Sequence, residues 1–234
     1  MVSGFRKDHA PTTSASGYYA NQPNPFNLTS RIAMRERKKM YERMMRTIAT
    51  TPDTTVLDVG VTSDLRPESN FFEKWYPHKN RITATGLEDA SFLEAEYPGL
   101  KYVKSDGTTL PFEDRKFDVV VSFAVLEHVG SHDKQRQFVH ELCRVGKRVY
   151  LTTPNRWFPI EYHTALPFLH WMSPPRYRKL LRSIGRDFYA DENHLNLLGG
   201  SDVRAMFPSN ARVSTDHHRM CGWISHLIFT AEII

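Results

Sequence analysis

Short runs of apolar, mostly β-branched residues recur along the chain, and an acidic, glycine or small polar residue follows most of them. The clearest runs lie at 55–60, 82–86, 117–123 and 147–153. Continuous apolar runs of this length are typical of parallel strands that are buried on both faces. Because the carboxyl ends of such strands meet at one edge of an open α/β sheet, we expect the polar residues that follow them to form a ligand site.

Amphipathic segments alternate with these runs, which predicts right-handed strand–helix–strand units and a parallel sheet. The expected strands are 54–60, 81–87, 101–105, 117–123, 147–153, 211–216 and 224–232. The expected helices are one from Thr29 or Ser30 to about Ala49, then 68–76, 90–96, 132–144 and 201–206. The first helix has a good N-cap and one apolar face, which we expect to pack on a sheet edge; its members are Ile32, Met40, Tyr41, Met44 and Ile48.

Two segments fall outside this alternation. Residues 1–28 are rich in Ser, Thr, Pro, Asn and Gly, which predicts a flexible leader before a domain at 29–234. Residues 154–199 are rich in prolines and aromatic residues and follow the expected strand 147–153, so they begin at the ligand edge. Apolar walls with a few polar groups are what a ligand pocket requires, and the same composition fits a lid that packs on the sheet. Both interpretations of this insertion can hold together.

Composition and charge narrow the picture only modestly. The chain has 234 residues and a net charge of +5, which permits an anionic partner without requiring one. Cys143 and Cys221 are far apart, so they predict no disulfide framework, and a turn is expected around His217, His218 and Cys221 rather than a metal site. No apolar run approaches the length of a membrane span, and no signal peptide is recognisable. We therefore expect a cytoplasmic protein, with peripheral membrane contact left open by the basic and aromatic residues near 171–182.

The order of four segments resembles the class I S-adenosylmethionine (SAM)-dependent methyltransferases, especially their small-molecule branch. These segments are Thr55–Gly60, Ile82–Glu88, Ser105–Phe112 and Phe117–His128, and the resemblance is good over residues 30–155. It implies an α/β fold with a Rossmann-like, seven-stranded sheet between helices, mostly parallel, in which the last strand is antiparallel. It also implies SAM as the cofactor and S-adenosylhomocysteine as the product.

SAM has a cationic sulfonium, an amino acid tail, a ribose diol and an adenine, and each part needs its own partner. Asp58 is placed to meet the amino group of the tail, Glu88 the ribose hydroxyls and Asp106 the adenine amino group. For any one of these acids taken alone, capping of the next helix is the alternative. The complete predicted cofactor set is Asp58, Gly60, Val61, Thr62, Glu88, Asp106, Gly107, Ser122 and Phe123.

The loop after the first strand departs from the pattern of this family. The family has alternating glycines there, whereas this chain reads Gly60-Val61-Thr62-Ser63-Asp64. Glycines allow close approach of the backbone to a ligand, and Asp64 adds a negative charge near the ligand's carboxylate. The hydroxyls of Thr62 and Ser63 can compensate for the missing glycines in binding the ligand. This departure motivates one alternative, a catalytically silent protein of the same fold that acts as a partner or regulator.

A methyl acceptor with a hydroxyl or ammonium group must lose a proton, so a base near the ligand edge is expected. His163 is the first candidate and His128 the second, and Glu161 is a candidate for accepting a proton or binding a cationic acceptor. For His128 the alternative is a histidine that is hydrogen-bonded at the start of a helix.

We predict no metal ion from the sequence. The Glu127-His128 pair resembles a metal-binding pair in some quinone-type methyltransferases, but those carry a further acid one turn earlier, where this chain has Phe123 and Ala124.

The sequence therefore predicts a SAM-dependent methyltransferase that acts on a small-molecule or lipid-linked acceptor. A second alternative, an RNA or protein methyltransferase, rests on the basic charge balance, but no separate nucleic-acid-binding module is recognisable. Nicotinamide binding is disfavoured because the glycine fingerprint is missing. The oligomeric state is left open.

Overall fold

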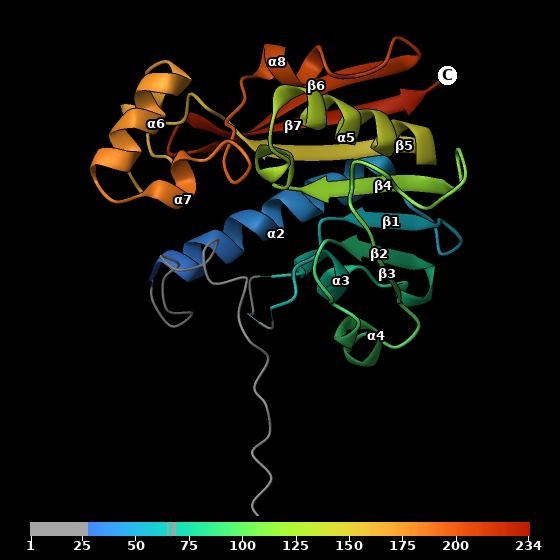
Figure 1. Ribbon diagram of the computed structural model, residues 1–234. Helices are drawn as coiled ribbons and strands as arrows, with labels where there is room; N and C mark the ends of the chain where they lie inside the picture. The colour runs from blue at the N-terminus through green and yellow to red at the C-terminus, as the bar shows by residue number, and fades with distance from the viewer. Residues whose placement is uncertain (1–27, 65, 67–68) are drawn as a thin grey trace, which may run out of the picture.

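A seven-stranded sheet forms the centre of the protein (Figure 1), whose computed structural model describes residues 28–64, 66 and 69–234. The strands are β1 (Val56–Val59), β2 (Ile82–Gly86), β3 (Lys101–Lys104), β4 (Phe117–Phe123), β5 (Gly146–Pro154), β6 (Ala211–Met220) and β7 (Trp223–Ile233). Their order is β3-β2-β1-β4-β5-β7-β6, and β7 runs antiparallel to both of its neighbours while the other pairs are parallel. The predicted fold class is confirmed. The predicted leader, apart from Leu28, lies outside the described residues.

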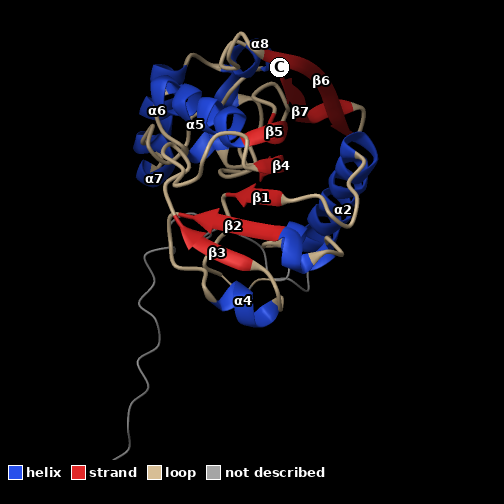
Figure 2. Ribbon diagram, turned by 90° about the vertical axis from the view of Figure 1, so that its right-hand side faces the viewer, coloured by secondary structure: helices blue, strands red, loops and turns tan. Residues whose placement is uncertain are grey.

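Helices cover both faces of the sheet (Figure 2). They are α2 (Leu28–Ile48), α3 (Phe71–Trp75), α4 (Phe92–Glu96), α5 (His132–Val145), α6 (Pro174–Ser183), α7 (Asp187–Ala190) and α8 (Gly200–Arg204), with the short 3₁₀ helices η1 (Lys79–Arg81), η2 (Leu126–His128) and η3 (Leu169–Trp171). One core cluster joins α5 and α8 to the sheet, and a second joins α2 and α3 to the opposite face.

The helix α5 illustrates why these segments fold as they do. The Ser131 hydroxyl accepts a hydrogen bond from the Lys134 backbone N–H and caps the first turn. Phe138, Val139 and Leu142 follow at helical spacing, are buried, and pack against β1 and β4. The prediction of 132–144 is therefore confirmed to within one residue.

The helix α2 differs from the prediction in three respects. It begins at Leu28, before the predicted N-cap residues. It packs on a face of the sheet against Tyr150 and Ile228, rather than on an edge, because β7 and β6 extend the sheet beyond β5 beneath it. Ile32 was expected on its buried face but is 45% exposed.

The turn expected around His217 and His218 is a correction too. Strand β6 continues through both residues to Met220, and the chain reverses at Cys221 and Gly222. Both turn residues have positive φ angles, of 50° and 83°, which suits a tight hairpin. The polar character of the two histidines hid the strand because β6 is an edge strand with a largely exposed face.

The insertion after β5 folds as a small helical unit at the carboxyl ends of the strands (Figure 1). Its own core is formed by buried residues of α6, α7 and the segment that follows: Tyr177, Leu181, Tyr189, Ala190 and Leu195. No helix in the described part of the chain is long and apolar enough to span a bilayer.

Candidate active site

The loop after β1 turns sharply at Gly60, which has a φ angle of +112°. The backbone N–H groups of Gly60 and Val61 both donate to the Thr85 carbonyl of β2, at 2.8 and 3.1 Å. A Cβ atom on Gly60 would lie 2.2 Å from a methyl carbon of Val125. Glycine is therefore required here by both the backbone conformation and the packing.

The altered part of this loop is held by side chains. The Thr62 backbone N–H donates to Asn70 Oδ1 at 2.9 Å, and Asn70 Nδ2 donates back to the Thr62 carbonyl at 3.0 Å. The Ser63 hydroxyl donates to a carboxylate oxygen of Glu88, the predicted ribose ligand. In the absence of the glycines, side-chain hydrogen bonds order the loop. The bond from Ser63 involves Glu88, a predicted cofactor residue.

Asp58 lies beside a second buried acid, Glu73 of α3. The exposed fractions of the two residues are 7% and 0%. Burial raises the pKa of Asp58 well above its usual range, and the neighbouring Glu73 carboxyl raises it further. Burial also raises the pKa of Glu73. Two buried carboxyl groups near the end of β1 suit a cationic ligand. The ammonium group in the amino acid tail of SAM is such a cation, so these residues fit the tail of the cofactor.

Sequence reasoning missed Glu73. It is an acid in a short amphipathic helix, where acids are ordinarily solvated, and only its contact with Asp58 distinguishes it.

The other predicted cofactor residues differ in their burial and in their contacts. Asp106 is exposed, and its Oδ1 accepts hydrogen bonds from the backbone and hydroxyl of Thr108, both at 2.9 Å, in a turn that is not followed by a helix. Ser122 is buried and donates to the Val59 carbonyl at 2.9 Å. Phe123 packs against Phe71, with ring centroids 4.9 Å apart. The roles of these residues toward a cofactor stay predictions.

Gly107 follows Asp106 at the end of β3 and packs closely against α5. A Cβ atom there would lie 2.4 Å from the ring of Phe138, so packing alone explains this glycine.

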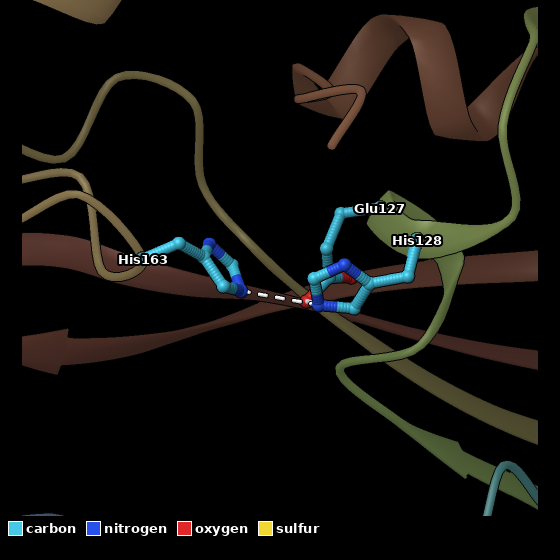
Figure 3. Close-up of side chains that lie close together, drawn as sticks. All are labelled: Glu127, His128 and His163. Carbon is cyan, nitrogen blue, oxygen red and sulfur yellow. Dashed lines mark hydrogen bonds and ion pairs between the residues drawn. The ribbon is translucent and has the colours of Figure 1, made fainter. Parts of the chain in front are cut away.

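The three predicted catalytic residues come together at the same edge of the sheet, and Figure 3 shows two of them, His128 and His163. His128 belongs to η2, directly after β4, whereas His163 and Glu161 come from the insertion after β5. The Nε2 atoms of the two histidines lie 3.1 Å apart, and His163 Nδ1 lies 2.7 Å from Glu161 Oε1. Residues separated by 35 positions therefore form one continuous chain of polar contacts.

The outer partners of the two histidines define where their protons lie. His128 Nδ1 is 2.7 Å from the His194 backbone carbonyl, which can only accept, so this nitrogen carries a hydrogen. His163 Nδ1 likewise donates to Glu161, whose carboxylate also accepts the backbone N–H groups of His163 and Thr164 at 2.9 and 2.6 Å. Both Nε2 atoms consequently face each other, and their contact requires one shared proton.

The electrostatics assign that proton to His163. Burial lowers the pKa of His128 to about 3, and the adjacent His163 contributes to the decrease. Burial alone would lower the pKa of His163 as well, but the hydrogen bond and the charge of Glu161 raise it above its usual value. The pKa of Glu161 falls to about 2 despite its burial, because His163 and the two backbone N–H groups stabilise the carboxylate.

Glu127 completes the cluster. From the sequence, no metal site and no catalytic role were predicted for this residue. It is 1% exposed, and its Oε2 accepts a hydrogen bond from the Thr153 hydroxyl at 3.0 Å. Its Oε1 has no hydrogen-bond partner among the residues that the structure describes, and it lies 3.9 Å from His128 Nε2. Burial raises the pKa of Glu127 to about 7. Ligand-type atoms of Glu127, His128 and His163 all lie within 4.8 Å of one another.

Comparison with known proteins concerns the type of domain and the fold. Residues 72–149, about a third of the chain, match the family described as "Methyltransferase domain". No sequence among the curated proteins matches the chain.

Solved structures resemble the protein in fold. The PH0226 protein of Pyrococcus horikoshii OT3 is 13% identical with a TM-score of 0.60, over 93% of this chain and 98% of that one. Magnesium protoporphyrin IX methyltransferase (ChlM) of Synechocystis PCC 6803, solved with bound S-adenosylhomocysteine, is 12% identical with a TM-score of 0.59, over 93% and 91%. The YcgJ protein of Bacillus subtilis is 15% identical with a TM-score of 0.54, over 82% and 95%.

At such low identities these structures establish the fold, and the family match adds the type of domain. Residues 72–149 therefore match a methyltransferase domain, and the whole chain has the Rossmann-like fold of SAM-dependent methyltransferases.

Proposed function

We propose that the protein transfers a methyl group from SAM to a small-molecule or lipid-linked acceptor that is bound beside the His128–His163 pair. One observation carries this proposal: Glu161, His163 and His128 form a connected polar chain at the carboxyl edge of the sheet. These three connected side chains lie next to the end of β4 and under the insertion after β5. An acceptor there would lie at the same edge as Asp58 and Glu88, which are proposed to hold the cofactor.

SAM, when bound, supplies a methyl group whose bond to sulfur breaks while the electron pair stays on sulfur. The acceptor's oxygen or nitrogen forms the new bond to carbon, so the acceptor must give up a proton. We assign that proton to Nε2 of His163, which can accept it once the proton that it shares with His128 has left the ring. Glu161 orients this ring through Nδ1 and stabilises the positive charge that develops on it, as a carboxylate does in other histidine-based sites. His128 contacts the same atom and positions the acceptor.

The insertion supports an acceptor with apolar parts. Trp157, Tyr162 and Phe168 are 51%, 40% and 52% exposed, although aromatic residues of this size are usually more buried. Tyr162 stacks on Phe158 with ring centroids 5.2 Å apart and nearly parallel planes, so its position is supported by packing. Such rings suit an aromatic or lipid-linked molecule better than a polar one.

Calorimetric titration of the full chain with SAM and with S-adenosylhomocysteine tests the cofactor part of this proposal. We expect both to bind, and we expect Glu88→Ala to lose SAM binding while keeping its circular dichroism spectrum. Unchanged affinity in Glu88→Ala would remove the ribose assignment. If a folded wild-type protein binds neither compound, the proposed transfer is wrong.

The acceptor is then sought by measuring S-adenosylhomocysteine release with phenols, amines, lipid-linked phenols and RNA as separate substrate classes. Turnover with RNA alone, sensitive to salt, would contradict the small-molecule assignment.

A second candidate function, a catalytically silent protein that acts through a partner, is favoured by one contact. The Ser63 hydroxyl engages the Glu88 carboxylate, which is the group proposed to bind the ribose. Lack of SAM binding by both wild type and Ser63→Ala, together with a stable complex with another protein, would support this candidate. SAM binding that appears only in Ser63→Ala would show that the loop blocks the site.

A further inference from the structure

We propose that Glu127, His128 and His163 bind one divalent transition-metal ion of the Zn²⁺ type, a site that the sequence did not predict. The ligand atoms are Glu127 Oε1 and the two Nε2 atoms, which converge in Figure 3. Imidazole nitrogens combined with one carboxylate are a donor set that suits Zn²⁺ and its neighbours in the first transition row better than Mg²⁺ or Ca²⁺.

The spacing of the ligand atoms is close to that of a metal centre. The two Nε2 atoms lie 3.1 Å apart, and Glu127 Oε1 lies 3.9 Å from His128 Nε2. In a tetrahedral Zn²⁺ site with bonds of about 2.1 Å, ligand atoms are about 3.4 Å apart. Small side-chain rotations would therefore bring the three atoms to bonding distance, because all of them already lie within 4.8 Å of one another.

The outer hydrogen bonds present both rings correctly. In metal sites a ligating histidine normally donates its second ring N–H to a carboxylate or a backbone carbonyl. Here His163 Nδ1 donates to Glu161 Oε1 and His128 Nδ1 donates to the His194 carbonyl, both at 2.7 Å. Each ring therefore turns Nε2, and not Nδ1, toward the other ring and Glu127.

The carboxylate of Glu127 supports the metal site independently of the spacing of the ligand atoms. Its side chain is 1% exposed, its Oε2 accepts from Thr153, and its Oε1, which lies near the histidines, has no hydrogen-bond partner in the described part of the chain. A buried polar atom without a partner is costly, and a cation would satisfy it. The nearby carboxylate of Glu161, which is 3% exposed, adds to the negative potential around the two rings.

The ion would have an open position. Glu127 is buried, but the side chains of His128 and His163 are 21% and 15% exposed, so the site opens on the imidazole side. Three protein ligands with one open position are characteristic of catalytic rather than structural zinc. An acceptor hydroxyl bound there would have a lowered pKa and would release its proton to water. This catalytic consequence rests on the proposed function, whereas binding of the ion does not.

The proton and the ion are alternative occupants of the histidine pair. Without an ion, one proton joins the two Nε2 atoms. With an ion, that proton is released and both nitrogens become ligands. His163 would then couple the insertion to the end of β4 through the metal, and the acceptor's proton would no longer need His163 as a base.

The test is metal binding by the full chain after treatment with a chelator and gel filtration. We would measure bound Zn²⁺ per chain by elemental analysis and the affinity by calorimetry, and would record the visible absorption of the Co²⁺-loaded protein. The variants are Glu127→Gln and His163→Gln, and the matched control is His132→Gln, an exposed histidine four residues beyond His128.

We expect one Zn²⁺ per chain for the wild type and for His132→Gln, with tetrahedral Co²⁺ absorption bands. Affinity should fall at least about tenfold in either ligand variant. If Glu127→Gln fails to fold, the affinity of His163→Gln for Zn²⁺ tests the site, because His163 belongs to the insertion and not to the central sheet. Absence of binding by the wild type, or binding that is unchanged in both variants, would overturn the inference. Zn²⁺ binding without SAM binding would leave the metal site intact and refute the proposed methyl transfer instead.

Discussion

Two buried acidic clusters at the same edge of the sheet differ in how their charge is balanced. On the cofactor side, Asp58 and Glu73 lie beside each other, and burial raises the pKa of both. On the acceptor side, Glu161 is also buried, but His163 lowers its pKa to about 2. The comparison teaches that burial alone does not decide the charge of a carboxyl group; the partner decides it.

The difference has a functional meaning. The acceptor side contains its own cationic partner and is electrostatically complete, apart from the unpartnered oxygen of Glu127. The cofactor side retains two carboxyl groups that a cationic ligand would balance. We therefore expect the cofactor side to gain more stability from its ligand than the acceptor side.

Removal of the acid on the acceptor side should have the largest effect on stability. Glu161→Ala would leave His163 buried without its partner, and breaking a buried ion pair from one side typically costs about 3–5 kcal/mol. The free energy of unfolding from urea titration measures this. Glu161→Gln, which keeps an oxygen that accepts from Nδ1, is the matched control and should lose less. Equal losses in both variants would show that charge is unimportant there.

Gly60→Ala should come next. The new Cβ atom would meet Val125 at 2.2 Å, and the φ angle of +112° is unfavourable for alanine. We expect a loss of about 2 kcal/mol or more in unfolding free energy, and weaker SAM binding. Val125→Ala in the same chain should recover only the steric part of the loss. Complete recovery would show that backbone conformation does not matter at this turn.

Glu73→Gln should stabilise the protein at neutral pH. Because the folded pKa of Glu73 is raised, its stabilising contribution is fully present below the unfolded pKa of about 4.3 and is lost as the pH rises through the folded value. The amide removes that loss, so we expect added stability at pH 7 and a flatter dependence on pH. Melting temperatures between pH 4 and 8 measure it. A difference in melting temperature between Glu73→Gln and the wild type that does not grow from pH 4 to pH 8 would contradict the raised pKa of Glu73.

Lys147→Ala should have the smallest effect. Lys147 Nζ lies 2.7 Å from Asp118 Oδ1, and this contact is the first cause of the lowered pKa of Asp118, which is about 2. The two side chains are 51% and 34% exposed, so solvent screens the pair and the change in stability should be within about 0.5 kcal/mol. A larger loss, compared with Lys134→Ala on the surface of α5, would show that surface pairs contribute as buried ones do.

The elements predicted best were those with a strong local pattern. Strand β4 begins and ends where its apolar run does, at Phe117 and Phe123. The prediction was poorer where polar residues occupy an edge strand, as at His217 and His218, because one face of β6 contacts solvent and its composition resembles that of a turn.

The candidate site shows the same division. Asp58 and Glu88 were predicted from their places at strand ends, and His128, Glu161 and His163 from their chemistry. Their mutual contacts were not predicted, since a distance of 3.1 Å between His128 and His163 depends on how the insertion folds back over the edge. Glu73 was missed for a related reason: its special character comes from Asp58, a neighbour in space.

The sequence by itself determined the α/β class, the strand edge that carries the site and the identity of most acids and histidines there, because periodicity and strand ends are local properties. The tertiary structure decided which of those groups share a proton, which are unpartnered, and which three converge on one point. Charge and hydrogen bonding of buried groups depend on neighbours across the fold, and no local pattern in the chain encodes those neighbours.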